Sequence, residues 1–173
     1  MSGARLLSWV VFTLAVAVIV HVATLVALPH FIMSRAISKM GVVNTIHHGK
    51  RVDETARGVV QPSPDLLYST CPYDLSAGPL HVHAPVPPGT YWSVSAFDAD
   101  TNNYFVRNDR HAAGVVDFYV VERGGALHPS GATIVTSPTR RGLLLFRTLI
   151  NDESRFAAID AARRQATCEI AAR

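Results

Sequence analysis

The stretch "PLHVHAPVPPGTYWSVSAFDA", residues 79–99, decides the fold class. Its first part alternates Leu80, Val82 and Ala84 with two histidines, and its last part alternates apolar and polar side chains from Trp92 onward. A period of two predicts strands with one buried face. The Pro-Pro-Gly sequence between them predicts a turn. We therefore expect residues 79–99 to form a β-hairpin.

Further short apolar runs extend this β pattern along the chain. They lie at residues 104–106, 114–122, 132–137 and 142–150, and Asn, Asp, Gly and Pro residues separate them. The earlier stretch "SPDLLYST", residues 63–70, is either the first strand or the start of an active site. Together the runs predict a mainly β fold over residues 59–173, as a β-sandwich or open barrel of six to seven strands.

A C-terminal helix is expected after the last strand. Asn151 and Asp152 can cap a helix that begins at Glu153. Apolar side chains then recur at helical spacing, so this face should lie on the sheet (Phe156, Ile159, Ala162, Ala166 and Ile170). We interpret the neighbouring Arg163 and Arg164 as a solvated face rather than a docking site.

The N-terminal part of the chain predicts one transmembrane helix. Residues 6–28 contain no charged side chain, and at about 1.5 Å per residue they span ~30 Å of hydrocarbon. A cleaved signal peptide has a shorter apolar core and a small-x-small cleavage site. This run ends instead in Leu28-Pro29-His30, which suits a helix stop. We expect an uncleaved anchor, with His21 as an interfacial or helix-contact residue rather than a proton relay.

The orientation follows from the short tail and the cysteines. Basic residues flank the apolar run on both sides, so their count does not decide the topology. A tail of residues 1–5 normally stays in the cytoplasm, and a cysteine pair suits an oxidising compartment. We expect the globular part on the extracytoplasmic side.

Residues 29–58 form a basic juxtamembrane segment that accounts for the chain's net charge of +3. Five basic side chains exceed two acidic ones there (Arg35, Lys39, Lys50, Arg51 and Arg57 against Asp53 and Glu54). Beside a bilayer this predicts attraction to lipid head groups, and not to nucleic acid. The apolar spacing within residues 30–41 favours either a short interfacial helix or a plain extension of the anchor.

Two longer stretches carry a family resemblance. They are "SPDLLYSTCPYDLSAGPLHVHAPVPPGTYWSVSAFDADTNNYF", residues 63–105, and "SPTRRGLLLFRTLINDESRFAAI", residues 137–159. Over about residues 60–170 the chain resembles the domain of unknown function 1254 family, as a short membrane-anchored member. The resemblance implies an all-β domain in bacterial exported or membrane-attached proteins. It also implies a frequent partner of the domain of unknown function 1214 type, and no established activity.

The opening stretch and a later strand supply the candidate ligand-binding residues. Asp65, Tyr68 and Ser69 place a carboxylate, a phenol and a hydroxyl together, but no Gly-x-Ser-x-Gly elbow surrounds Ser69. Arg147 lies in a strand that is apolar on both faces, so it should meet a carboxylate. Asp98 and Asp74 are the leading partners, followed by Asp65 and Asp100.

Two functions remain open from these residues. The first is a membrane-anchored binding or accessory domain of the bacterial inner membrane, with a periplasmic globular part and an envelope protein as partner. The second is a small-ligand-binding protein or enzyme subunit that uses the Asp65, Tyr68, Ser69, Asp98 and Arg147 cluster. No catalytic residue and no cofactor is predicted.

No metal site is predicted either, although two motifs raise the question. His81 and His83 share a strand face as metal ligands do, but a third ligand at suitable spacing is missing. Residues 98–109 resemble a calcium loop loosely but lack its central Gly and final Glu. Turn formation by Asn and Asp side chains accounts for that loop.

Cys71 and Cys168 are the two cysteines, 97 residues apart. An oxidising compartment would allow a disulfide between them. With Cys168 in the expected helix, the bond requires the first strand to run along the flank of that helix. Two unpaired thiols remain the alternative.

Overall fold

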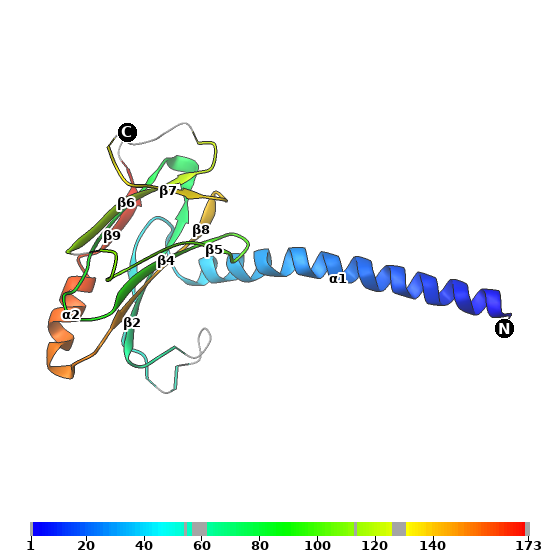
Figure 1. Cartoon of the computed structure of the whole chain (residues 1–173), viewed down its shortest axis with the longest axis horizontal. Coiled ribbons are helices and arrows are strands. Elements are labelled where there is room, and N and C mark those ends of the chain that lie inside the picture. Colours follow the sequence, from blue (N-terminus) through cyan, green and yellow to red (C-terminus); the bar gives the residue numbers. More distant parts are fainter. Residues whose placement is uncertain (1, 54, 57–61, 113, 126–130, 172–173) are drawn as a thin grey trace.

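The computed structural model describes residues 2–53, 55–56, 62–112, 114–125 and 131–171. A long N-terminal helix leads into a β domain of two sheets, which are not closed into a barrel (Figure 1). The mainly β class is confirmed. The described residues form nine strands where six to seven were expected. The expected domain boundary between residues 58 and 59 lies outside the described residues.

The first sheet, sheet A, has the strand order β1-β2-β8-β4-β5 and is antiparallel throughout. Its strands are β1 (His47–His48), β2 (Leu66–Asp74), β8 (Arg141–Leu149), β4 (Trp92–Asp98) and β5 (Asn103–Asn108). The stretch "SPDLLYST" therefore leads into a strand, which pairs with β8 over its whole length. Sheet A begins at β1, within the segment that we assigned to the membrane surface.

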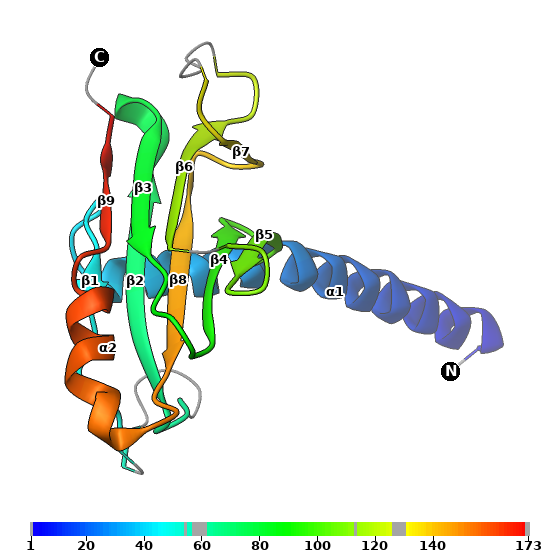
Figure 2. The ribbon, with the colours of Figure 1, turned by 60° about the vertical axis from the view of Figure 1, so that its left-hand side comes forward.

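The second sheet, sheet B, has the order β7-β6-β3-β9. It consists of β7 (Ile134–Ser137), β6 (Val115–Glu122), β3 (Leu80–Pro85) and β9 (Thr167–Ile170). The pair β6 and β7 is parallel, and the other pairs are antiparallel. In Figure 2 the strands of sheet B lie in front of β2 and β8 of sheet A.

The expected hairpin over residues 79–99 is wrong. Its two strands exist, but β3 belongs to sheet B and β4 to sheet A. Each strand turns its apolar side chains inward, as Val82 and Val94 do, and both of these are fully buried. Burying both apolar faces against each other requires the strands to separate into two layers, so the Pro-Pro-Gly turn crosses between sheets.

The expected C-terminal helix is correct at its start and wrong in its length. A 3₁₀ turn (Glu153–Arg155) follows the Asp152 cap, and the α-helix α2 runs only over Phe156–Arg163. Residues Thr167–Ile170 then form β9 beside β3. The alternating exposure of these four residues suits an edge strand that pairs with β3 and turns Cys168 into the core. A second 3₁₀ turn (Leu75–Ala77) follows β2.

The main core lies between the sheets. Phe105 of sheet A packs across it on Phe118 of sheet B, with the ring centroids 5.2 Å apart. Trp92 packs on Phe146 of the neighbouring strand within sheet A, at a ring distance of 6.3 Å. A smaller cluster forms where α2 places Ile159 and Phe156 on side chains from the ends of two strands (Leu67 and Ile150). The helix therefore covers part of the sheet layer, as expected.

A disulfide joins Cys71 of β2 to Cys168 of β9, with the Cα atoms 6.5 Å apart. Both cysteines are buried. The bond links sheet A to sheet B across the core, because Cys168 lies in a strand rather than in the expected helix.

Buried hydroxyl groups also connect the two sheets. The Tyr73 hydroxyl lies 2.9 Å from both the Tyr104 hydroxyl and Ser137 Oγ. Burial raises the pKa of Tyr73, so the phenol stays protonated. Gly142 provides the space for this ring, since a Cβ there would lie 2.2 Å from the Tyr73 hydroxyl oxygen.

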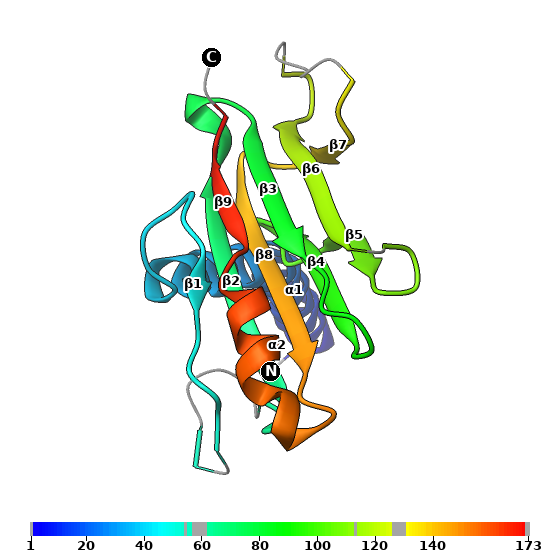
Figure 3. The same cartoon turned by 90° about the vertical axis from the view of Figure 1, so that its left-hand side faces the viewer.

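The N-terminal helix α1 spans Gly3–Lys39 and is long and apolar enough to cross a membrane. The expected stop at Pro29 is wrong. Pro29 lies inside the helix, and its ring costs one backbone hydrogen bond. The residues after it continue the helix, so they form the plain extension rather than a separate interfacial helix. Gly41, with φ of +105°, turns the chain away beyond the helix end. Viewed with the sheets toward the reader, α1 recedes behind sheet A (Figure 3).

Candidate functional site

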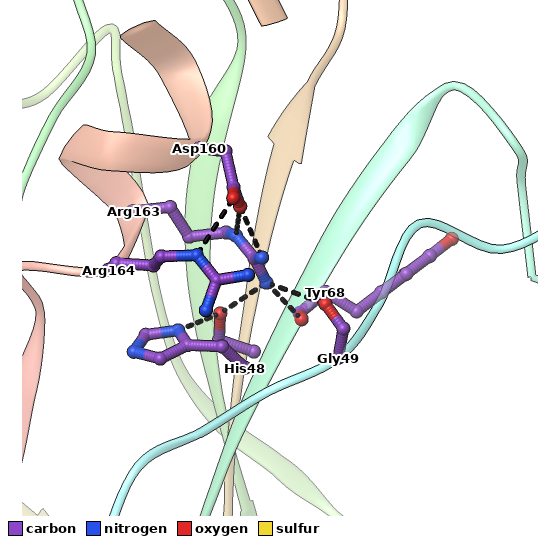
Figure 4. A network of polar contacts seen from close by, with 7 residues as sticks. His48, Gly49, Tyr68, Asp160, Arg163 and Arg164 are labelled. Carbon is purple, nitrogen blue, oxygen red and sulfur yellow. Dashed lines mark hydrogen bonds and ion pairs between the residues drawn. The ribbon is translucent and has the colours of Figure 1, made fainter. Parts of the chain in front are cut away.

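The densest polar cluster surrounds Arg163 at the end of α2 (Figure 4). The Arg163 side chain is 3% exposed, and its guanidinium forms an ion pair with Asp160. It also donates to the Tyr68 carbonyl at 2.8 Å, the Gly49 carbonyl at 3.1 Å and Ser69 Oγ at 3.2 Å. One buried cation thus ties together α2, β2 and the segment that follows β1.

His48 completes this cluster through Ser69. Its Nδ1 lies 2.9 Å from Ser69 Oγ. Burial lowers the pKa of the His48 imidazole, and the nearby guanidinium groups of Arg163 and Arg164 lower it further. A neutral Nδ1 can accept the Ser69 hydroxyl proton, while Arg163 donates to the same oxygen.

This arrangement resembles a nucleophile and its base, but its burial favours a structural role. Ser69 is 1% exposed, so a substrate cannot reach its Oγ without a rearrangement of the strands. A nucleophilic serine needs an accessible oxygen beside donors that stabilise the developing charge. We interpret the cluster as a polar lock between three segments.

Asp160 lies on the more exposed side of this cluster, where it pairs with Arg163. Although burial favours its protonated form, hydrogen bonds from Arg164 and Arg163 keep the pKa of Asp160 below its usual value. The expectation of a solvated face is wrong for Arg163 and right for Arg164, which is 55% exposed. The spacing of Asp160 to Arg163 and Arg164 was visible in the sequence as i,i+3 and i,i+4 pairs. Nothing local indicated His48.

The expected ligand-binding residues do not form one cluster. Tyr68 and Arg147 are cross-strand partners and share a face of sheet A. Ser69 is the next residue along β2, so it points to the opposite face. Asp65 is exposed ahead of β2. Asp98 lies opposite Gly142, five positions from Arg147 along β8, or about 17 Å at ~3.4 Å per residue.

The expected ion pair of Arg147 is also wrong within the described residues. Asp74 pairs with Arg141 at 2.7 Å. Asp98 accepts hydrogen bonds from the backbone of Asp100 and Asn102, and so closes the turn between β4 and β5. Arg147 is half-buried and forms no ion pair with any described carboxylate.

His81 and His83 lie on the outer face of sheet B and share one carboxylate. His81 Nε2 and His83 Nδ1 lie 3.1 and 2.9 Å from oxygens of Asp117 on β6. The hydrogen bond from His83 lowers the pKa of Asp117. Over the described ranges, no group of three or more His, Cys, Asp or Glu side chains is placed to hold a metal ion.

These features define an open two-sheet β domain carried on a long apolar helix. A family model described as "Protein of unknown function (DUF1254)" matches residues 43–169, which is more than half of the chain. The chain belongs to this family. A comparison with curated proteins finds no match.

One solved structure shares the fold at low sequence identity. The crystal structure of the VPA0106 protein from Vibrio parahaemolyticus matches with a TM-score of 0.64 at 14% identity. The match covers 85% of this chain and 35% of that one. An uncharacterised protein from Burkholderia cenocepacia matches at 17% identity and a TM-score of 0.48, over 73% of this chain and 34% of the other. The chain thus spans about a third of the length of these proteins.

Proposed function

We propose that the chain is a membrane-anchored binding or accessory protein of the bacterial envelope. In this proposal α1 stays attached and crosses the inner membrane, with the tail of residues 1–5 in the cytoplasm. The β domain lies in the periplasm and binds another envelope protein, with a protein of the domain of unknown function 1214 type as the first candidate.

One observation carries the proposal: an uninterrupted 37-residue helix leads into a domain whose two sheets are joined by a disulfide. The most apolar part of α1 is left unburied by the residues that the structure describes, so it needs a covering such as lipid. A buried disulfide suits an oxidising compartment. Both features support a periplasmic domain held at the membrane.

The longer structural relatives support a protein partner. In the Vibrio parahaemolyticus protein this fold is about a third of the chain. Interfaces between domains of one chain resemble those between transiently associated proteins, so this fold can present such a surface to a separate protein. The open sheet edges at β5 and β7 are available for that contact within the described residues.

The proposal is tested by location first and by partner second. The tagged full chain should remain in the membrane fraction after washing with salt and alkali. An external protease should cleave the β domain in spheroplasts and leave it intact in inverted vesicles. Crosslinking in intact cells should then retain a specific envelope protein. A domain protected in spheroplasts, or a chain that is released by salt, would contradict the proposal.

A further inference from the structure

The β domain contacts α1 very close to the end of the apolar run. His30 forms an ion pair with Asp100, which lies in the turn between β4 and β5. Met33, three residues further along the helix, is 6% exposed. In Figure 1 the β4–β5 end of the domain lies beside the C-terminal part of α1.

The other side of the helix is apolar and exposed at the same level. Phe31 and Ile32 are 57% and 52% exposed, although they flank the contacts made by His30 and Met33. The Arg35 guanidinium lies 4.9 Å from the centre of the Phe31 ring. An arginine above an aromatic ring is typical of side chains at a membrane interface, where the charge reaches the head groups and the stem stays apolar.

Helix geometry sets the depth of these contacts. His30 and Met33 lie two and five residues beyond Leu28, or about 3 and 7.5 Å along the axis at ~1.5 Å per residue. The head-group layer on each side of the ~30 Å hydrocarbon core is roughly 5–8 Å thick. A tilted helix would bring the contacts still closer to the core. The domain therefore has no room to stand away from the lipid.

The surface at this depth has the chemistry of a head-group contact. A groove of about 600 Å³ lies between α1 and the sandwich, with Met33 and Ile37 on the helix side and Arg140 and Arg141 on the strand side. Each arginine uses its Nε for a carboxylate, Glu122 or Asp74, while both side chains remain mostly exposed. With Asp100 nearby, this rim presents both charge signs, as a zwitterionic lipid surface requires.

We propose that the β4–β5 turn and the rim formed by Arg140 and Arg141 rest on the lipid head groups, so that the domain has a fixed orientation on the bilayer. This inference rests on the membrane anchor proposed above. It adds a second contact with lipid, made by the folded domain itself and separate from the basic segment.

The test measures the depth of two exposed positions in the full chain. Because the native cysteines are bonded to each other, a nitroxide attaches only to an introduced thiol. Asn103→Cys places it at the start of β5, next to the β4–β5 turn. Val115→Cys places it on the outer face of sheet B and serves as the matched control, since Val115 is 48% exposed.

Each labelled protein is placed in nanodiscs of phosphatidylethanolamine and phosphatidylglycerol, with and without a nickel-chelating lipid. We expect nickel lipid to shorten the spin relaxation time severalfold at position 103 and to leave position 115 unchanged. Equal responses at the two positions would overturn the inference, because they indicate a domain that moves freely on its helix.

An insertion provides a second control. Seven polar helix-forming residues between Pro29 and His30 lift the domain by about 10 Å and nearly preserve its rotation around the helix. Nickel lipid should then no longer shorten the spin relaxation time at position 103. A shortening that persists would count against the inference. A chain that fails to enter nanodiscs would overturn the anchor as well. Entry without a response at position 103 would overturn only the fixed orientation.

Discussion

Arg163 holds distant segments of the chain together through contacts that the neighbouring residues in the sequence do not indicate. Its Nη1 donates to two backbone carbonyls and a serine hydroxyl that lie more than 90 residues away in the chain. Asp160, on the same helix, balances its charge. A buried arginine is stable only with such a set of partners.

Replacing Arg163 with Met should therefore lower the free energy of unfolding by about 3–5 kcal/mol, because it leaves buried carbonyl and hydroxyl groups without a donor. Arg164→Met is the matched control. It removes the neighbouring, exposed ion pair and should cost at most about 1 kcal/mol. Urea denaturation of both variants measures the difference, and equal losses would contradict the polar lock.

His48 makes the same lock sensitive to acid. Its pKa in the folded chain lies below the ordinary value of 6.5, because burial and two arginines oppose the charged form. The unfolded chain therefore binds more protons near this pH, and stability that is present above 6.5 is lost as the pH falls. Melting temperatures between about pH 7.5 and pH 5 should decrease less in His48→Gln than in the unaltered chain. Parallel curves would show that His48 makes no contribution.

Thr148 offers a substitution that should stabilise the fold. Its Oγ1 is the one buried side-chain polar atom without a hydrogen-bond partner among the residues that the structure describes. Thr148→Val keeps the shape and removes the unsatisfied group, so stability should rise by about 1 kcal/mol. Thr90→Val is the control with the opposite sign, because Thr90 Oγ1 donates to the Leu149 carbonyl at 2.7 Å. Calorimetry of both variants decides the sign.

At the scale of elements, β9 and its disulfide determine how the two sheets are held together. β9 occupies the edge of sheet B beside β3, and Cys168 within it is bonded to Cys71 in sheet A. The hydroxyl cluster of Tyr73, Tyr104 and Ser137 joins the sheets at a second place. A covalent and a polar link thus replace the closure that a barrel would provide.

Loss of the disulfide should destabilise the domain by roughly 4–5 kcal/mol in the chain-entropy model, because the bond closes a loop of 97 residues. Cys71→Ala combined with Cys168→Ala tests the size of the effect by denaturation. Labelling of thiols in the denatured, unreduced protein tests the bond itself. Two reactive thiols in that sample would contradict it.

At the scale of the whole molecule, α1 and the β domain contact each other directly. The helix continues past Pro29 to Lys39, and its last turns contact the sandwich through His30 and Met33. With the membrane anchor proposed above, these contacts would tie the orientation of the sheets to that of the helix in the bilayer.

This arrangement predicts that the mature protein retains α1. Mass spectrometry of the membrane-extracted chain should give an N-terminus at or next to Met1. A cleaved signal sequence would instead give a chain that begins near residue 28. That result would remove the anchor and leave a free β domain.

The expected strands were largely correct, whereas the way they pair was not. The alternation of apolar and polar side chains around Val82 and Val94 correctly identified two strands, because this alternation depends only on residues that are close in the sequence. The same pattern could not tell whether they pair with each other or face each other across a core. The predicted helix was wrong over residues 164–170 for a related reason. Their apolar spacing fits either a helix or an edge strand, and only pairing with β3 selects the strand.

Composition and periodicity predicted the mainly β class and the apolar helix, and the order of local motifs resembled that of the family, because these features are local to the sequence. The folded structure was needed to show that β3 and β4 separate into different sheets and that Cys168 lies in a strand. It was also needed to show that Arg163 rather than Arg147 is the arginine with buried partners. Each of these depends on contacts between residues far apart in the chain. Such contacts arise from packing two layers on a shared core, and that packing has no local signature.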